Sequence, residues 1–126
     1  MHQFRFVTAI AVVVFTGALL AAQGPDITGT WTATFPTQVG EQSYTYEFMV
    51  KGTELMGMAK GNLTGDSKIS EGKVDGKMFT FVENATYEGM PLRITYSGTV
   101  TSADEISLTR TVVEGMSEQF VAKRAK

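Results

Sequence analysis

Two charged side chains stand where an alternating apolar pattern should continue. Arg110 follows two aliphatic residues at a spacing of two, and Glu83 follows Phe79 and Phe81 in the same way. Residues two apart in a β-strand lie on the same face, so both charges are expected to point inward. A buried charge requires a partner. The two residues could pair with each other, or Arg110 could anchor the carboxylate of a ligand; alternatively, Arg110 lies at a rim and reaches water.

Aromatic side chains on the same faces are candidates for the lining of a binding cavity. We expect a ligand to contact Tyr44, Tyr46, Phe48, Phe81, Glu83, Tyr96 and Arg110. The alternative is a filled interior, because eight-stranded barrels are at the margin between a packed core and room for one small ligand. Methionines could likewise fill gaps in a core or form an exposed binding surface: Met49, Met56, Met58, Met78, Met90 and Met116.

The chain lacks the residues that most often carry out catalysis near neutral pH. It has no cysteine, and its single histidine is His2. Nucleophilic, acid–base and transition-metal chemistry usually relies on these two residue types. We therefore expect no metal, no cofactor and no catalytic residue, and we favour a non-catalytic protein without excluding an enzyme. An alternative is an isomerase, cyclase or lyase that pairs a glutamate with a tyrosine.

The first 22 residues have the pattern of an export signal. One basic residue, Arg5, precedes the uncharged apolar run 7–22, and Gln23 follows it. This pattern predicts a signal peptide at 1–22 and a periplasmic or extracellular protein. A retained membrane anchor is the alternative, but no basic stop-transfer cluster follows the run, so we expect no stable membrane anchor.

The charge of the remaining chain argues against two classes of partner. Without Arg5, ten basic residues stand against thirteen acidic ones, and no basic cluster is present. Nucleic acids and anionic membranes are therefore not expected partners. We expect a monomer with a flexible lead at 23–28 and a single domain at 29–126.

Short β-type runs separated by turn residues follow from residue 29 onward. Their composition and alternation predict eight strands: 29–35, 42–50, 53–60, 67–74, 77–86, 91–101, 105–113 and 116–124. Two-residue hairpin turns are predicted where glycine can supply a positive φ: at Lys51-Gly52, Asp75-Gly76 and Glu114-Gly115. Such short turns connect antiparallel neighbours. The predicted fold is an all-β, eight-stranded up-and-down meander closed into a barrel, with a β-sandwich as the alternative.

The two ends of this predicted domain resemble the calycin pattern of lipocalins and fatty-acid-binding proteins. Gly29-Thr30-Trp31 opens the first strand, and Lys123-Arg124 closes the last. In those families, a Gly-x-Trp packs its indole against an Arg or Lys from the final strand. The resemblance implies that Trp31 and Arg124 are structural residues, whose cation–π contact is worth roughly 0.5–2 kcal/mol.

Further segments resemble small lipocalin-like domains of secreted bacterial proteins that mostly lack an assigned activity: DITGTW, GKVDG, YSGTV, LTR and AKR. This resemblance implies a fold more than a function. Our leading hypothesis is a secreted, non-catalytic carrier of a small lipophilic or amphipathic molecule. A protein-interaction or inhibitor module with a filled barrel is the alternative. The volume of the interior discriminates between them, because ligand pockets begin at about 300 Å³.

Overall fold

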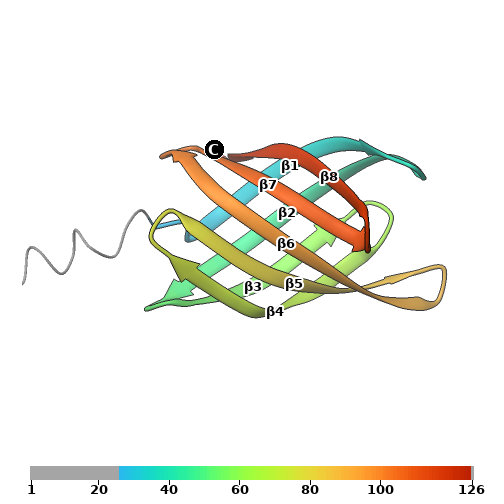
Figure 1. Ribbon diagram of the computed structural model, residues 1–126, viewed down its shortest axis with the longest axis horizontal. Helices are drawn as coiled ribbons and strands as arrows, with labels where there is room; N and C mark the ends of the chain where they lie inside the picture. Colours follow the sequence, from blue (N-terminus) through green and yellow to red (C-terminus); the bar gives the residue numbers. More distant parts are fainter. Residues whose placement is uncertain (1–25, 126) are drawn as a thin grey trace, which may run out of the picture.

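The computed structural model describes residues 26–125, which form a closed antiparallel barrel (Figure 1). Its strands are β1 (Gly29–Thr37), β2 (Gly40–Lys51), β3 (Glu54–Gly61), β4 (Gly65–Asp75), β5 (Met78–Tyr87), β6 (Met90–Ser102), β7 (Glu105–Val113) and β8 (Met116–Arg124). Each strand pairs with the next, and β8 pairs with β1. The predicted meander barrel is confirmed, the sandwich alternative is wrong, and the architecture is consistent with a lipocalin-like fold.

The predicted strands agree with the observed ones to within two residues at each end. Two turns are displaced by one residue from their predicted places. Lys51 and Asp75 are the last residues of β2 and β4, so Gly52 and Gly76 are the first residues of the turns that follow. Their φ angles of 65° and 63° are readily adopted only by glycine, which explains where each strand stops.

The meander places its hairpins at two opposite ends of the barrel (Figure 1). The hairpins β1–β2, β3–β4, β5–β6 and β7–β8 lie at one end, here called the open end. The other three hairpins lie at the end where β1 begins and β8 finishes, here called the closed end. The predicted signal segment 1–22 lies outside the described residues. Within residues 26–125, we find no helix with the length and apolar character needed to span a membrane.

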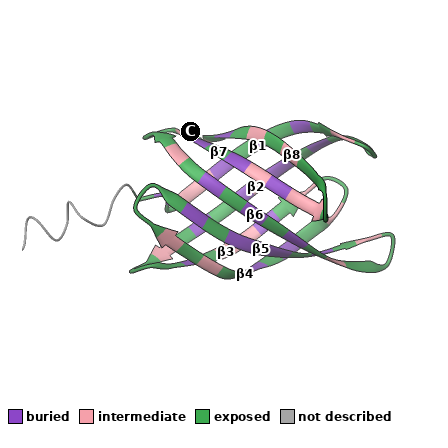
Figure 2. Ribbon diagram, in the orientation of Figure 1, coloured by how far each residue is buried: buried purple, intermediate pink, exposed green. Residues whose placement is uncertain are grey.

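Buried and exposed residues largely alternate along the strands, as the period of two predicts (Figure 2). Towards the closed end, aromatic rings fill the interior of the barrel. The rings of Phe81 and Tyr96 stack with their centroids 4.3 Å apart, and Phe48 packs edge-on against Phe81 at 5.4 Å. Rings in such contacts contribute stability beyond their burial. This part of the barrel is solid, which matches the filled alternative.

Trp31 and Arg124 seal the closed end. The indole is fully buried, and its Nε1 donates a hydrogen bond of 2.9 Å to the carbonyl of Ile27. The Arg124 guanidinium carbon lies 4.4 Å from the centroid of the ring, which is cation–π geometry. Gly29 has a φ of 137°, which glycine adopts readily, and a Cβ there would lie 2.8 Å from Arg124 Nη1 and force the guanidinium to move. Ile27 is buried, and Arg124 also donates hydrogen bonds to the carbonyls of Asp26 and Thr28, so residues 26–28 pack against this end of the barrel.

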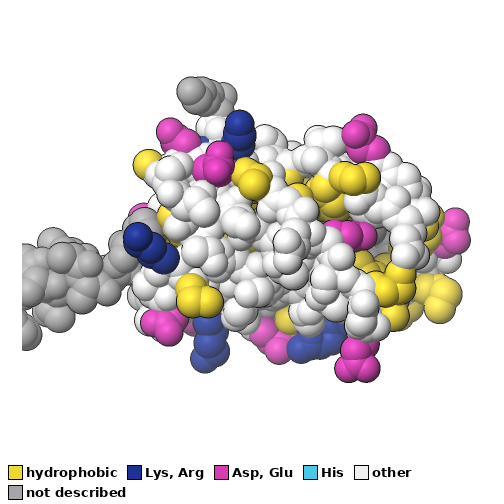
Figure 3. Space-filling model, turned by 45° about the horizontal axis from the view of Figure 1, so that its top comes forward, with side chains coloured by type: hydrophobic (Ala, Val, Ile, Leu, Met, Phe, Trp, Pro, Cys, Tyr) yellow, Lys and Arg dark blue, Asp and Glu magenta, His cyan; other side chains and the backbone are white. Residues whose placement is uncertain are grey.

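Most of the methionines lie on the surface rather than in the core. The exposed ones are Met49, Met56, Met78, Met90 and Met116. The core-filling interpretation is wrong for these five, because their positions face outward along a strand or flank a turn. On the face drawn in Figure 3, hydrophobic side chains gather at the open end.

Candidate functional site

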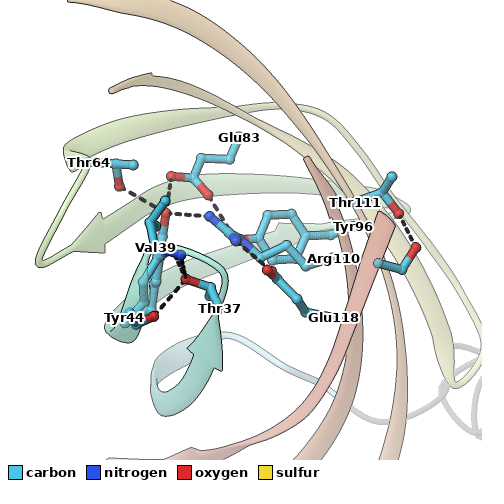
Figure 4. A network of polar contacts seen from close by, with 12 residues as sticks. Thr37, Val39, Tyr44, Thr64, Glu83, Tyr96, Arg110, Thr111 and Glu118 are labelled. Atoms are coloured by element: carbon cyan, nitrogen blue, oxygen red, sulfur yellow. Dashed lines mark hydrogen bonds and ion pairs between the residues drawn. The ribbon is translucent and has the colours of Figure 1, made fainter. Parts of the chain in front are cut away.

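Arg110 and Glu83 both lie inside the barrel, with 2% and 0% of their surfaces exposed. They do not form the direct pair that was one of the sequence-based alternatives, because two tyrosine hydroxyls lie between them (Figure 4). Tyr44 and Tyr96 each donate a hydrogen bond of 2.8 Å to Glu83, one to each carboxylate oxygen. Arg110 donates from Nε to the Tyr96 oxygen at 3.0 Å and from Nη2 to the Tyr44 oxygen at 3.2 Å.

The proton positions in this network follow from what each group can donate. A tyrosine hydroxyl has one proton and two acceptor sites. Tyr96 gives its proton to Glu83, so the hydroxyl of Tyr46, 3.0 Å away, must donate to Tyr96. Tyr44 also gives its proton to Glu83 and accepts from Arg110. The donors therefore converge on a carboxylate that only accepts.

A second carboxylate binds Arg110 from the side of the open end. Arg110 Nη1 donates to Glu118 Oε1 at 2.7 Å, and the Glu118 side chain is 25% exposed. The two residues are register partners on β7 and β8. Sequence reasoning missed Glu118, although it has the same parity as the inward-facing Phe120 and Ala122. The pattern that identified Arg110 could have identified Glu118 as well.

A cavity of about 520 Å³ opens at the open end, above Arg110. Its polar lining includes Gln42, Thr64, Arg110 and Glu118. Its apolar lining includes Pro36, Val39, Leu92, Val112, Val113 and Met116. Arg110 is buried, whereas Val39, Val113 and Met116 are exposed. The cavity therefore passes from a polar, charged floor to an apolar mouth.

The structure gathers the predicted lining residues into a connected group but does not place them all at the cavity. Arg110 lines the cavity directly. Hydrogen bonds join four others to it, either directly or through one another: Tyr44, Tyr46, Glu83 and Tyr96. Phe48 and Phe81 lie in the packed aromatic core and are not among the residues that line the cavity. Sequence reasoning missed Gln42 and Leu92, whose inward parity matches Tyr44 and Tyr96.

Gln42 carries an unsatisfied acceptor in the cavity wall. The side chain is 5% exposed, and its Nε2 donates to Thr37 Oγ1 at 3.1 Å. Its Oε1 has no hydrogen-bond partner among the described residues. A buried polar atom left without a partner costs about 1–3 kcal/mol. In the observed conformation this oxygen is buried, and a rotation of the side-chain amide would bring it to the cavity that Gln42 lines.

The buried tyrosines should make the barrel sensitive to alkaline pH. Burial, with the nearby negative charge of Glu83, raises the pKa of Tyr44 to about 12 and holds the pKa values of Tyr46 and Tyr96 well above the ordinary value of 10.0. A pKa that is higher in the folded state gives stability that is present below pH 10 and is lost as the pH rises. Each unit of difference corresponds to about 1.4 kcal/mol.

We therefore expect the free energy of unfolding to fall steadily between about pH 10 and pH 12. Tyrosinate absorbance and circular dichroism, followed together in an alkaline titration, should change in one cooperative step. Ionisation of Tyr44, Tyr46 and Tyr96 near pH 10 with the barrel intact would contradict the buried network.

The polar groups of this cavity are suited to binding the head of a small molecule. Within 26–125, no group of three or more acidic, histidine or cysteine side chains is placed to hold a metal ion. The arrangement can instead neutralise, orient and hydrogen-bond a polar head while apolar walls contact the rest of a molecule. Comparison with protein-family models, with curated proteins and with solved structures finds no match to this chain.

Proposed function

We propose that this protein is an exported, lipocalin-like, non-catalytic binder that holds a small amphipathic molecule at the open end of its barrel. The observation that carries the proposal is the cavity of about 520 Å³ with a charged floor and an apolar mouth. Cavities of roughly 300–1,000 Å³ with a few placed polar groups are typical of sites for small molecules.

The rest of the barrel is consistent with a single binding site that is entered from the open end. The aromatic core is packed, and the Trp31–Arg124 contact covers the closed end. This contact also supports the lipocalin-like assignment, because a cation over a buried indole is what the calycin resemblance implies. The predicted signal peptide at 1–22 supports export.

The two alternatives are less compatible with this arrangement. A module with a filled barrel leaves the cavity without a role. An enzyme requires an acid or base in reach of its substrate, whereas Glu83 is fully buried and is not among the residues that line the cavity. Glu118 does line the cavity, but its Oε1 is held in an ion pair with Arg110.

Filling the cavity should abolish binding without unfolding the protein. Leu92→Trp adds an aromatic ring to the cavity wall, and we expect it to weaken binding at least about tenfold, or about 1.4 kcal/mol. Trp31 is a poor reporter because it lies at the closed end. The measurement is therefore displacement of the fluorescent probe N-phenyl-1-naphthylamine, with native mass spectrometry to count bound molecules.

The matched control is Val121→Trp, which adds the same ring to an exposed position on β8. This variant should bind the probe as the unmodified protein does, and both variants should unfold at similar urea concentrations. If the unmodified protein binds neither the probe nor any amphipathic compound, or if Leu92→Trp binds equally well, the proposal fails.

A further inference from the structure

Two carboxylates surround the single guanidinium at the floor of the cavity: Glu118 lines the cavity, and Glu83 is buried behind the floor. Arg110 donates from Nε, Nη1 and Nη2 to three protein groups, so each of its nitrogens already has a partner. Glu118 pairs with this guanidinium directly, whereas Glu83 is linked to it only through the hydroxyls of Tyr44 and Tyr96. An anionic head group would have to displace Glu118 or lie beside it, and like charges in a poorly solvated site repel strongly. A head group that donates hydrogen bonds meets no such obstacle.

Gln42 gives independent support for a ligand that donates hydrogen bonds. Its buried Oε1 has no partner among the residues described, and because Gln42 lines the same cavity as Glu118, a rotation of its amide would present this oxygen to a donor there. The amide nitrogen is already engaged with Thr37. The protein therefore supplies two acceptors to the cavity, one carboxylate and one amide oxygen. A ligand that satisfies both must carry at least two donor hydrogens, which a protonated amine does.

The rim of the open end also carries negative charge. Its four hairpin tips are residues 37–41, 61–66, 87–90 and 113–116. Each tip has one exposed acidic residue and no lysine or arginine: Glu41, Asp66, Glu88 and Glu114. On the face drawn in Figure 3, acidic side chains lie around the hydrophobic ones at this end. The closed end, by contrast, also carries Lys51, Lys77 and Lys123. A mouth ringed by one sign of charge attracts ligands of the other sign.

From these three observations we infer that the ligand is a cationic amphipath, with a protonated amine that reaches the floor of the cavity and an apolar chain along its walls. This inference rests on the proposed function and specifies the chemical class that the site takes. The ammonium group donates to Glu118 and Gln42, while Leu92 and Val112 contact the chain. It also reverses the expectation that Arg110 anchors a ligand carboxylate.

The test compares three compounds that share one apolar chain and differ in the head group. Decylamine, decanol and decanoate are titrated into the protein at neutral pH, below their micellar concentrations, and binding is measured by calorimetry. We expect decylamine to bind most tightly and decanoate most weakly, with a difference of at least about tenfold. Added salt should weaken the binding of decylamine more than that of decanol, because salt screens only the charge.

Two variants separate the roles of the acceptors. Glu118→Gln should lower the preference for decylamine over decanoate about tenfold. Gln42→Met removes the amide oxygen without a change of charge and should weaken decylamine about fivefold, which corresponds to one hydrogen bond. The control is Glu54→Gln, which removes the same charge from an exposed position at the closed end and should leave the preference unchanged.

The outcomes separate this inference from the proposed function. If decanoate or decanol binds more tightly than decylamine, the protein is still a binder of amphipaths and the amine assignment is wrong. If Glu118→Gln folds but keeps the full preference for decylamine, the assignment is also wrong. If none of the three compounds binds, both the inference and the proposed function fail.

Discussion

Replacement of Arg110 by methionine is expected to lower the free energy of unfolding by about 3–5 kcal/mol. The arginine is buried and accounts for the positive charge in the network that contains Glu83, Tyr44 and Tyr96. Its removal leaves the buried carboxylate of Glu83 without a counterion inside the barrel, which is costly. Methionine preserves much of the apolar volume, so the loss measures the charge rather than a cavity. Urea unfolding followed by circular dichroism gives the value.

The control for this prediction is Arg93→Met. Arg93 forms a short ion pair with Glu71, and both side chains are exposed, so its loss should change stability by no more than about 1 kcal/mol. Adding Glu83→Gln to Arg110→Met should restore part of the stability, because the uncompensated charge is gone. Equal effects of Arg110→Met and Arg93→Met would show that the network contributes nothing to the fold.

Replacement of Trp31 by alanine is expected to lower the free energy of unfolding by about 3–5 kcal/mol. The indole is fully buried, donates a hydrogen bond to Ile27 and lies under the guanidinium of Arg124. Its loss opens a cavity at the closed end and leaves Arg124 without its ring. Domains of this kind are stable by about 5–15 kcal/mol in total. The urea midpoint of Trp31→Ala should therefore lie well below that of the unmodified protein.

Two further variants serve as references for the effect of Trp31→Ala on stability. Trp31→Phe keeps an aromatic surface beneath Arg124 but loses the Nε1 donor, so it should fall between the alanine variant and the unmodified protein. Val121→Ala truncates an exposed side chain on β8 and should change stability by less than about 0.5 kcal/mol. Because Trp31 is the only tryptophan, circular dichroism rather than intrinsic fluorescence must report the transition. A loss from Trp31→Ala as small as that from Val121→Ala would contradict the role assigned to the indole.

Much of the fold could be predicted because strand periodicity is a local property. The inward positions of Arg110 and Glu83 follow from parity with their apolar neighbours, and both are buried. Short glycine turns left antiparallel pairing as the economical topology. The turn glycines Gly52 and Gly76 set the ends of β2 and β4 one residue later than predicted, because the pattern of composition does not show which turn position adopts a positive φ.

The cavity could not be predicted because its volume depends on how side chains from different strands fit together. Parity places Phe81 and Leu92 on the same inner surface, yet Phe81 packs in the aromatic core and Leu92 lines the cavity. The difference is one of height along the barrel axis, which depends on the register of all eight strands. The interleaving of Tyr44 and Tyr96 between the buried charges likewise depends on contacts across the barrel.

The separation of the solid aromatic core from the cavity has a consequence for how this protein can diversify. The stacked rings and the Trp31 seal stabilise the barrel from positions that do not line the cavity. The tips of the four open-end hairpins can therefore accept new side chains with little loss of stability, since loops tolerate substitution better than cores. Ligand preference and foldability can change independently in such a molecule, which makes it a suitable scaffold for selecting new binding specificities.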